Sequence, residues 1–180
     1  MIYQCETKYQ GGIFMRSTPI GIVLMDDERE HVYTLSHEEN TRAVNQWADI
    51  IRQNLKNVDG TAPQVVVGSE TIHSVRTAQK VGEELSRANV KQIVMCYNVW
   101  NFPFMVWPFL NSVGRDMPIL SLSNNNGKYP GNVGLLATDG ALRQTGLRTH
   151  RIVGDMNDPK TVAKVMDWLR ASQTYTTMQN

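Results

Sequence analysis

Short, uninterrupted apolar runs alternate with longer segments of mixed polarity along most of this chain. The runs lie at residues 19–25, 63–70, 91–99, 117–123 and 148–156. Apolar runs of this length predict strands that are buried on both faces. The segments that follow them carry apolar residues at helical spacing, which predicts helices at 37–55, 74–89, 103–113, 131–146 and 158–172.

Five strands that alternate with five helices predict one parallel sheet with helices on both faces. We expect right-handed crossovers and the flavodoxin-like strand order 2-1-3-4-5, which together give a three-layer α/β fold. The alternation starts just after residue 18, so we expect an N-terminal arm at 1–18 and a single domain at 19–180.

A few residues predict where the helices begin or bend. Ser36 and Glu39 have the spacing of a capping box, which makes the acidic stretch before them a polar loop. Asp158 is expected to cap the last helix, with Pro159 in its first turn. Pro108 is expected to kink or interrupt the third helix, because proline lacks the N–H that a helix interior needs.

Composition narrows the class of protein. The chain has 180 residues, a formal net charge of +1 and 19% charged residues, which argues against a nucleic-acid partner. Its two cysteines make no disulfide framework, and Cys96 lies in an apolar run where a reduced, buried thiol is typical, so the cytoplasm is favoured. Neither an apolar run of about 18 residues nor a signal-peptide pattern is present, so we expect no membrane association.

Polar and aromatic side chains follow the predicted strands at their C-terminal ends, where open parallel sheets bind ligands. Tyr97, Asn98 and Trp100 follow the third strand, and Asn124 follows the fourth. Aromatic rings stack on the CH faces of sugars, while amides bond sugar hydroxyls, so this edge suits a neutral polyol. The same residues could instead cap the sheet or face a partner subunit. We expect Trp107 and Phe109, further on, to pack in the core.

Other chemistries have weaker support. The chain has no Walker motif and no G-x-G-x-x-G after the first strand. The acids in that position, which include Asp26 and Asp27, are expected to form a solvated loop rather than a cation site. The four histidines share no metal-ligand spacing, and no nucleophile-elbow motif supports a Ser/His/Asp triad. We therefore assign no catalytic residue and no metal ligand.

The order of elements resembles the N-terminal domain of the L-fucose and L-arabinose isomerases, especially the fucose-isomerase-like branch. Four stretches carry the resemblance: IGIVLMDDEREHVYTL, IVMCYNVWNFPFMVWPFLNSV, MPILSLSNNNGKYPGNVGLLATDGALRQTGLRTHRIVGDMNDP and KTVAKVMDWLRA. The third stretch, in which Pro130-Gly131 precedes a helix of small residues, is the most specific. The resemblance covers nearly all of the chain after the arm.

The resemblance implies a role in an aldose–ketose isomerase that uses a divalent metal, usually Mn²⁺, whose ligands lie in later domains. In this family the N-terminal domain of one subunit closes over the active site of a neighbour. An arginine after the first strand and an aromatic residue after the third touch the sugar there. Arg29 matches the arginine, and either Tyr97 or Trp100 matches the aromatic residue.

Two departures leave the sugar unspecified. Some relatives have an Arg-Arg pair where this chain has Arg29-Glu30, and fucose isomerases proper have Cys-Trp-Cys at Cys96-Tyr97-Asn98. We expect a substrate-enclosing and subunit-contact domain that works in a homo-oligomer or with separate catalytic domains, has no cofactor of its own and is inactive alone. The alternatives are a stand-alone sugar- or nucleotide-binding module and a structural oligomerisation domain.

Overall fold

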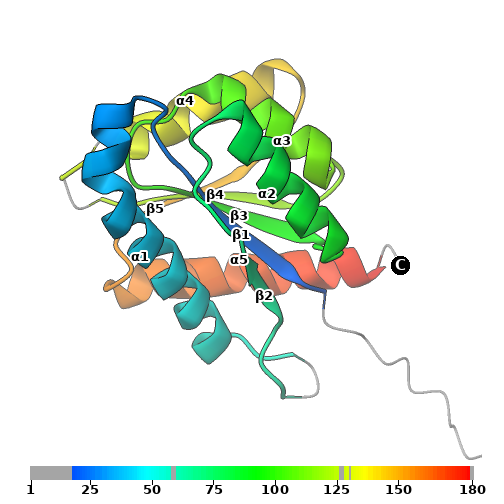
Figure 1. Cartoon of the computed structure of the whole chain (residues 1–180). Helices are drawn as coiled ribbons and strands as arrows, with labels where there is room; N and C mark the ends of the chain where they lie inside the picture. The colour runs from blue at the N-terminus through cyan, green and yellow to red at the C-terminus, as the bar shows by residue number, and fades with distance from the viewer. Residues whose placement is uncertain (1–17, 58–59, 126–127, 130, 179–180) are drawn as a thin grey trace, which may run out of the picture.

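The computed structural model describes residues 18–57, 60–125, 128–129 and 131–178. Its centre is a five-stranded parallel sheet (Figure 1). The strands are β1 (Ile20–Met25), β2 (Val65–Val67), β3 (Gln92–Tyr97), β4 (Ile119–Ser123) and β5 (His150–Val153). Their order is β2-β1-β3-β4-β5, which confirms the predicted α/β fold and its topology.

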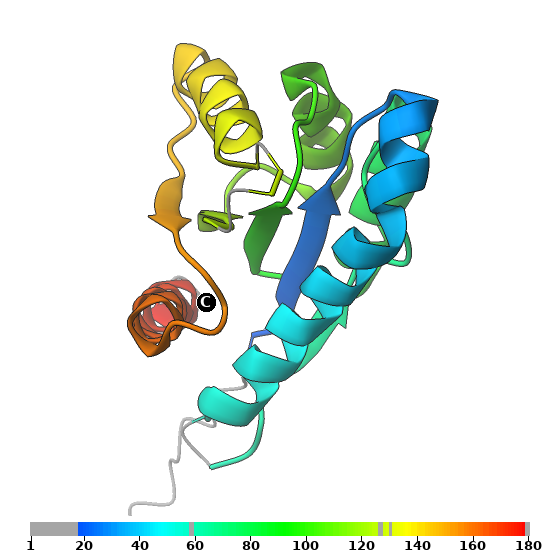
Figure 2. The same ribbon diagram turned by 90° about the vertical axis from the view of Figure 1, so that its left-hand side faces the viewer.

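Helices cover both faces of this sheet. The helical elements are α1 (Glu30–Asn54), α2 (Val75–Arg87), the 3₁₀ turn η1 (Pro103–Met105), α3 (Val106–Val113), α4 (Gly131–Gln144) and α5 (Pro159–Met178). One apolar cluster joins the sheet to α2, α3 and α4, and a second joins it to α1 and α5. Strand ends are visible between α1 and α5 in Figure 2.

The three central strands are buried on both sides because alternate side chains enter the two clusters. The prediction of burial on both faces is wrong for β5, an edge strand in which only Ile152 is buried, and β2 at the other edge is only partly buried. Val23 and Met25 of β1 belong to the first cluster, whereas Ile22 and Leu24 belong to the second. Every residue of β1, β3 and β4 is buried. This explains why these strands appear in the sequence as continuous apolar runs rather than alternating patterns.

The first helix begins earlier than the capping-box pattern predicted. α1 starts at Glu30, so Ser36 lies inside the helix and donates its hydroxyl hydrogen bond to the Val32 carbonyl at 2.9 Å. The predicted cap at Ser36 and the solvated loop before it are therefore wrong. The last helix agrees with expectation: the Asp158 carboxylate accepts from the Lys160 N–H at 3.0 Å, and α5 begins at Pro159.

The aromatic segment after β3 packs largely inside the protein. Phe109 is fully buried, as predicted, and Trp107 packs against the same cluster, while Phe104 stays 46% exposed. α3 runs unbroken from Val106 to Val113, so the expected interruption at Pro108 is absent. Pro108 falls in the first turn of α3, where a backbone N–H has no partner within the helix.

α4 touches the main chain that follows β3. A Cβ atom on Gly134 would lie 2.5 Å from Asn101 Oδ1 and 2.9 Å from the Val99 carbonyl, and one on Gly131 would meet the Tyr97 carbonyl. Only residues without a side chain allow this approach. The two glycines therefore fix α4 against the loop that carries Asn98 and Trp100.

Most of the predicted N-terminal arm lies outside the described residues. Thr18, where the description begins, places its hydroxyl 3.3 Å from that of Thr176 on α5. Across the described part of the chain, no helix is both long and apolar enough to cross a membrane.

Candidate functional site

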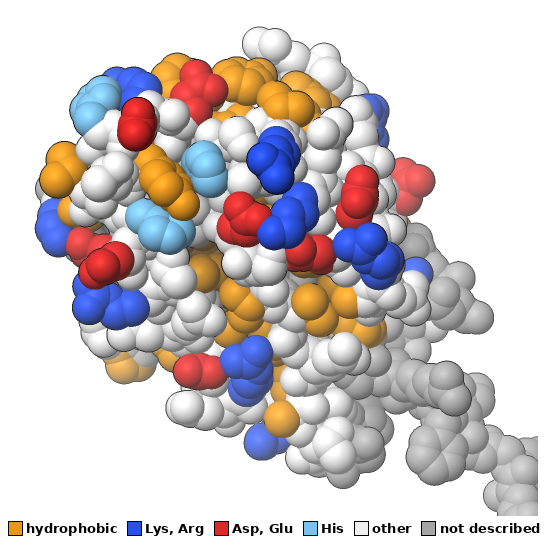
Figure 3. All heavy atoms as spheres, in the orientation of Figure 1, with side chains coloured by type: hydrophobic (Ala, Val, Ile, Leu, Met, Phe, Trp, Pro, Cys, Tyr) orange, Lys and Arg blue, Asp and Glu red, His pale blue; other side chains and the backbone are white. Residues whose placement is uncertain are grey.

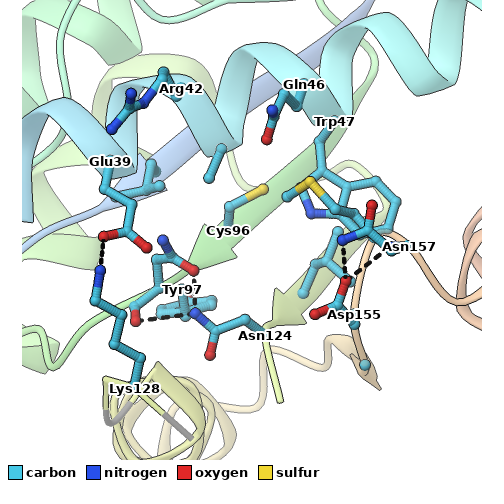
Figure 4. Close-up of a pocket in the computed structure, with 16 residues that line it drawn as sticks. Glu39, Arg42, Gln46, Trp47, Cys96, Tyr97, Asn124, Lys128, Asp155 and Asn157 are labelled. Carbon is cyan, nitrogen blue, oxygen red and sulfur yellow. Dashed lines mark hydrogen bonds and ion pairs between the residues drawn. The ribbon is translucent and has the colours of Figure 1, made fainter. Parts of the chain in front are cut away.

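A cavity of about 540 Å³ opens at the C-terminal edge of the sheet, between α1 and the loop after β5 (Figure 4). Its inner wall contains apolar groups from the second core cluster, which include Trp47, Cys96 and Leu122. Polar side chains surround them, contributed by α1 and by the loops after β3, β4 and β5: Glu39, Arg42, Gln46, Asn98, Asn124, Lys128, Asp155 and Asn157.

Two predicted site residues, Asn98 and Asn124, line this cavity and bond each other. The Asn124 amide donates to the backbone carbonyl of Asn98 at 3.1 Å and to its side-chain oxygen. The Asn98 amide in turn donates to Asn40 Oδ1 on α1 at 3.0 Å. The structure thus joins the ends of β3 and β4 to α1 through side-chain amides.

This amide chain ends at a buried carboxylate. Asn40 donates to Asp26 Oδ1 at 2.9 Å, and the Asp27 N–H donates to the same oxygen at 2.9 Å. Asp26 is fully buried at the end of β1, and burial raises the pKa of its carboxyl group, although the bond from Asn40 opposes the shift. An acceptor-only carboxylate fixes which way the Asn40 amide points, and hence the direction of the whole chain.

Arg29 is held by the neighbouring acid. Its guanidinium donates to both oxygens of Asp27, at 2.9 and 2.6 Å, and its side chain stays 49% exposed. Burial by itself would raise the pKa of Asp27, but the hydrogen bonds and charge of Arg29 lower that pKa below its ordinary value. Asp27 is therefore a buried, ionised support for Arg29 and not part of a solvated loop.

The predicted pair Arg29 and Trp100 meets through a third residue. The Arg29 guanidinium carbon lies 5.7 Å from the centre of the Phe102 ring. Trp100 meets the same ring edge-on, with centroids 5.9 Å apart and planes at 84°. We call Arg29, Trp100 and Phe102 the Arg–aromatic edge, which lies outside the lining of the cavity.

Tyr97 is placed differently from Trp100. Its ring is 1% exposed and belongs to the first core cluster, and its hydroxyl lies 3.9 Å from Met95 Sδ. Burial raises the pKa of this hydroxyl. Tyr97 also lines the cavity, but its side chain is buried, whereas Trp100 is partly exposed, so Trp100 is the more accessible of the two predicted aromatic residues.

The rim of the cavity has balanced charges. Lys128 forms an ion pair with Glu39, and the Asp155 carboxylate accepts from the side-chain amide of Asn157 at 2.9 Å. The described residues contain no group of three or more His, Cys, Asp or Glu that could hold a metal ion, so the Mn²⁺ that the resemblance implied finds no ligand set among them. The arrangement is suited to hydrogen bonding with a neutral polar compound.

The family comparison matches almost the whole described chain. The family described as L-fucose isomerase, first N-terminal domain, matches residues 17–180. The chain belongs to this family. L-fucose isomerases from two strains of Bacteroides fragilis are each 29% identical to it over 180 residues, and that from Bacteroides thetaiotaomicron is 28% identical.

The L-fucose isomerase relatives are much longer than this chain. Each match covers 89% of the chain, which spans only 28% of the relative's length. Among solved structures, a diflavin flavoprotein A3 from Nostoc sp. is 15% identical, with a TM-score of 0.48 and coverage of 89% of this chain and 94% of its own. That likeness is too remote to bear on function.

Sequence reasoning missed several residues of this L-fucose isomerase-type N-terminal domain. Asn40 had a usable signal, because it is an uncharged amide on the buried side of an amphipathic helix. Phe102 lay within the quoted aromatic segment but was not singled out as the contact between Arg29 and Trp100. Nothing in the sequence pattern indicated that Asp26 would be fully buried.

Proposed function

We propose that this chain is the substrate-enclosing and subunit-contact domain of a fucose-isomerase-like aldose–ketose isomerase. The observation that carries the proposal is the Arg–aromatic edge, which presents a half-exposed guanidinium beside an aromatic ring at the ligand-binding edge of the sheet. The family match and the names of the relatives support the reaction class.

In this role Arg29 donates hydrogen bonds to a sugar oxygen, and Trp100 covers one face of the sugar. Two nitrogens of the Arg29 guanidinium already donate to Asp27, so the guanidinium is held in place before any ligand arrives. Asn98 and Asn124 line the neighbouring cavity and bond hydroxyl groups of the substrate as it enters. Each group acts by binding and orientation.

The proton transfers and the metal chemistry of the isomerisation belong, in this proposal, to the other regions of the complete protein. The described residues offer no metal ligand set, and we expect this chain alone to have no isomerase activity with added Mn²⁺. The complete enzyme is a homo-oligomer in which the Arg–aromatic edge faces a neighbouring subunit. The buried Cys96 is compatible with a cytoplasmic protein.

A hybrid enzyme tests the proposal. Residues 17–180 replace the first N-terminal domain of the Bacteroides fragilis L-fucose isomerase, and aldose-to-ketose conversion is measured. We expect Arg29→Ala and Trp100→Ala each to lower kcat/KM by an amount equal to about 1–3 kcal/mol. Trp100→Ala should change Tm little, whereas Arg29→Ala should also lower Tm, because it leaves the buried Asp27 carboxylate without its partner, so activity is compared well below the Tm of both variants.

Arg115→Ala is the matched control for Arg29→Ala. Arg115 also lies 5.7 Å from an aromatic ring, that of Trp107, but it precedes β4 and so lies at the opposite edge of the sheet. Its loss should leave kcat/KM unchanged. Unaltered activity in both Arg29→Ala and Trp100→Ala would contradict the proposal and show that these residues have a purely structural role.

Thermal shift separates the two alternatives. A stand-alone sugar- or nucleotide-binding module is favoured by the polar cavity beside Asn98 and Asn124, and it should gain stability when the matching ligand is added. A structural oligomerisation domain should respond to protein concentration but to no polyol.

A further inference from the structure

Three arginines occur where α4 ends and β5 begins. Arg143 lies in the last turn of α4, Arg148 follows in the connection, and Arg151 is the second residue of β5. Figure 2 shows this connection between α4 and β5, the outermost strand on that side of the sheet. Parallel strands all begin at the same edge, so these arginines lie away from the C-terminal edge that carries the candidate site.

Two of these arginines meet at one buried carboxylate. Arg143 Nε donates to Asp139 Oδ2 at 3.1 Å, and Arg151 Nε lies 3.3 Å from the same oxygen. The other carboxylate oxygen, Oδ1, accepts from the Thr149 hydroxyl. The Asp139 side chain is 2% exposed, whereas those of Arg143 and Arg151 are 54% and 41% exposed. The two guanidinium groups are therefore held close together and face the solvent.

This group of residues carries an excess of positive charge. One cation is enough to neutralise a buried carboxylate, so the second arginine on Asp139 exceeds what the acid requires. Arg148 is exposed, and no ion pair joins it to another residue in the described part of the chain. Three arginines and one aspartate have a formal net charge of +2. By contrast, acidic and basic side chains are interspersed on the face that Figure 3 shows.

The two guanidinium groups also have unused hydrogen-bond donors. Only the Nε atom of each is engaged by Asp139, and the terminal Nη groups of Arg143 and Arg151 have no hydrogen-bond partner among the residues that the structure describes. Guanidinium groups bind phosphate and carboxylate through pairs of parallel N–H donors. A phosphate group has three acceptor oxygens and a charge of about −1.5 to −2 at pH 7, so it matches two guanidinium groups better than a carboxylate does.

We propose that the Arg143–Arg151 pair binds a phosphate group, either as the free ion or as part of a small phosphate ester. The terminal Nη groups of both arginines donate to the phosphate oxygens, and Arg148 adds attraction through its charge. Asp139 holds both guanidinium groups in place before the anion arrives. The bound phosphate then joins the end of α4 to the start of β5. Binding here does not require the sugar-binding role of the Arg–aromatic edge.

NMR titration of the isotope-labelled 180-residue chain tests this site, with inorganic phosphate and D-glucose 6-phosphate as probes and sodium chloride to keep the ionic strength constant. We expect saturable shifts of the Arg143 and Arg151 Nε–H signals with at least one probe. Tighter binding of D-glucose 6-phosphate assigns the site to a phosphate ester, and tighter binding of inorganic phosphate assigns it to the free ion. Shifts that saturate with neither probe, or that chloride or uncharged D-glucose reproduces, would overturn the proposal.

Arg151→Gln removes one of the two guanidinium groups but leaves Asp139 paired with Arg143. It should raise the Kd of the tighter probe at least about fivefold, because half of the donors are lost. Arg52→Gln is its matched control, since Arg52 is 40% exposed, pairs with Asp49 at 2.8 Å and lies beside β2, the opposite outer strand. The Kd of this control should stay unchanged. Equal Kd values for Arg151→Gln and wild type would refute the site.

Arg148→Glu gives an answer even if Arg151→Gln does not fold. Arg148 is exposed and makes no ion pair within the described residues, so its replacement should leave the packing of the domain intact. The introduced carboxylate repels a phosphate dianion and should raise the Kd at least about threefold. Undiminished affinity in a folded Arg148→Glu protein would also refute the site.

Discussion

Replacement of Asn40 by alanine should destabilise the fold far more than a surface substitution. Asn40 is fully buried, donates to Asp26 at 2.9 Å and accepts from Asn98 at 3.0 Å. Alanine removes both bonds and leaves the Asn98 amide without its acceptor. Asp26 Oδ1 retains only the backbone N–H of Asp27.

The magnitude follows from these two bonds. A hydrogen bond to a carboxylate contributes about 1.5–3 kcal/mol, and a buried amide left unpaired costs about 1–3 kcal/mol. Asn98 borders the cavity of the candidate site and is 7% exposed, so water replaces part of what its amide loses. We therefore expect the free energy of unfolding to fall by about 2–4 kcal/mol.

Urea unfolding followed by circular dichroism measures this change. Asn45→Ala is the control, since Asn45 lies on the same helix, is exposed, and bonds only the Thr41 carbonyl at 2.8 Å. Its free energy of unfolding should change by less than about 0.5 kcal/mol. A loss below about 1 kcal/mol for Asn40→Ala, or one no larger than for Asn45→Ala, would show that the amide chain is not a stabilising unit.

Three further predictions concern buried groups. Burial raises the pKa of the Asp26 carboxyl group in the folded protein, so the stability that Asp26 contributes is lost as pH rises from about 4 through that raised pKa. In urea unfolding, the free energy of unfolding of the wild type minus that of Asp26→Asn should therefore be greater at pH 4 than at pH 7. Gly134→Ala should lower the free energy of unfolding by about 1–3 kcal/mol through its contact with Asn101, whereas Gly140→Ala, where a Cβ meets nothing within 4 Å, should raise it by about 0.5–1 kcal/mol. Burial raises the pKa of Cys96, so in a Cys5→Ser background an aromatic disulfide reagent at pH 8 should label Cys96 only after unfolding. Labelling of that native variant at the unfolded rate would contradict the burial of Cys96.

The fold could be predicted because its determinants are local. Each buried strand is a short apolar run, and each helix has its own periodicity, so element order and the parallel sheet follow without knowledge of distant contacts. The cap at Asp158 is equally local, since its partner Lys160 is two residues away. The start of α1 was misjudged because Ser36 and Glu39 mimic a capping box while Asp27 and Arg29 form the actual entry turn.

The candidate site was only partly predictable because its contacts join distant segments. Asn98 and Asn40 are bonded although they are 58 positions apart, and Asn40 also donates to the buried Asp26. One distinction within the site could have been drawn from the sequence. Successive side chains of a strand point to opposite faces of the sheet, so one face of β3 carries Ile93, Met95 and Tyr97. Asn98 follows on the opposite face, and this alternation already separated the Tyr97 ring from the Asn98 amide.

The glycine contacts of α4 bear on how this domain can change over time. Gly131 and Gly134 meet main-chain and buried atoms of the loop after β3, and not the outward side chain of Trp100. The backbone course of the loop therefore does not depend on which side chain is present at position 100. Such a loop can exchange the Trp100 side chain for another without loss of its backbone course, provided that both glycines are retained.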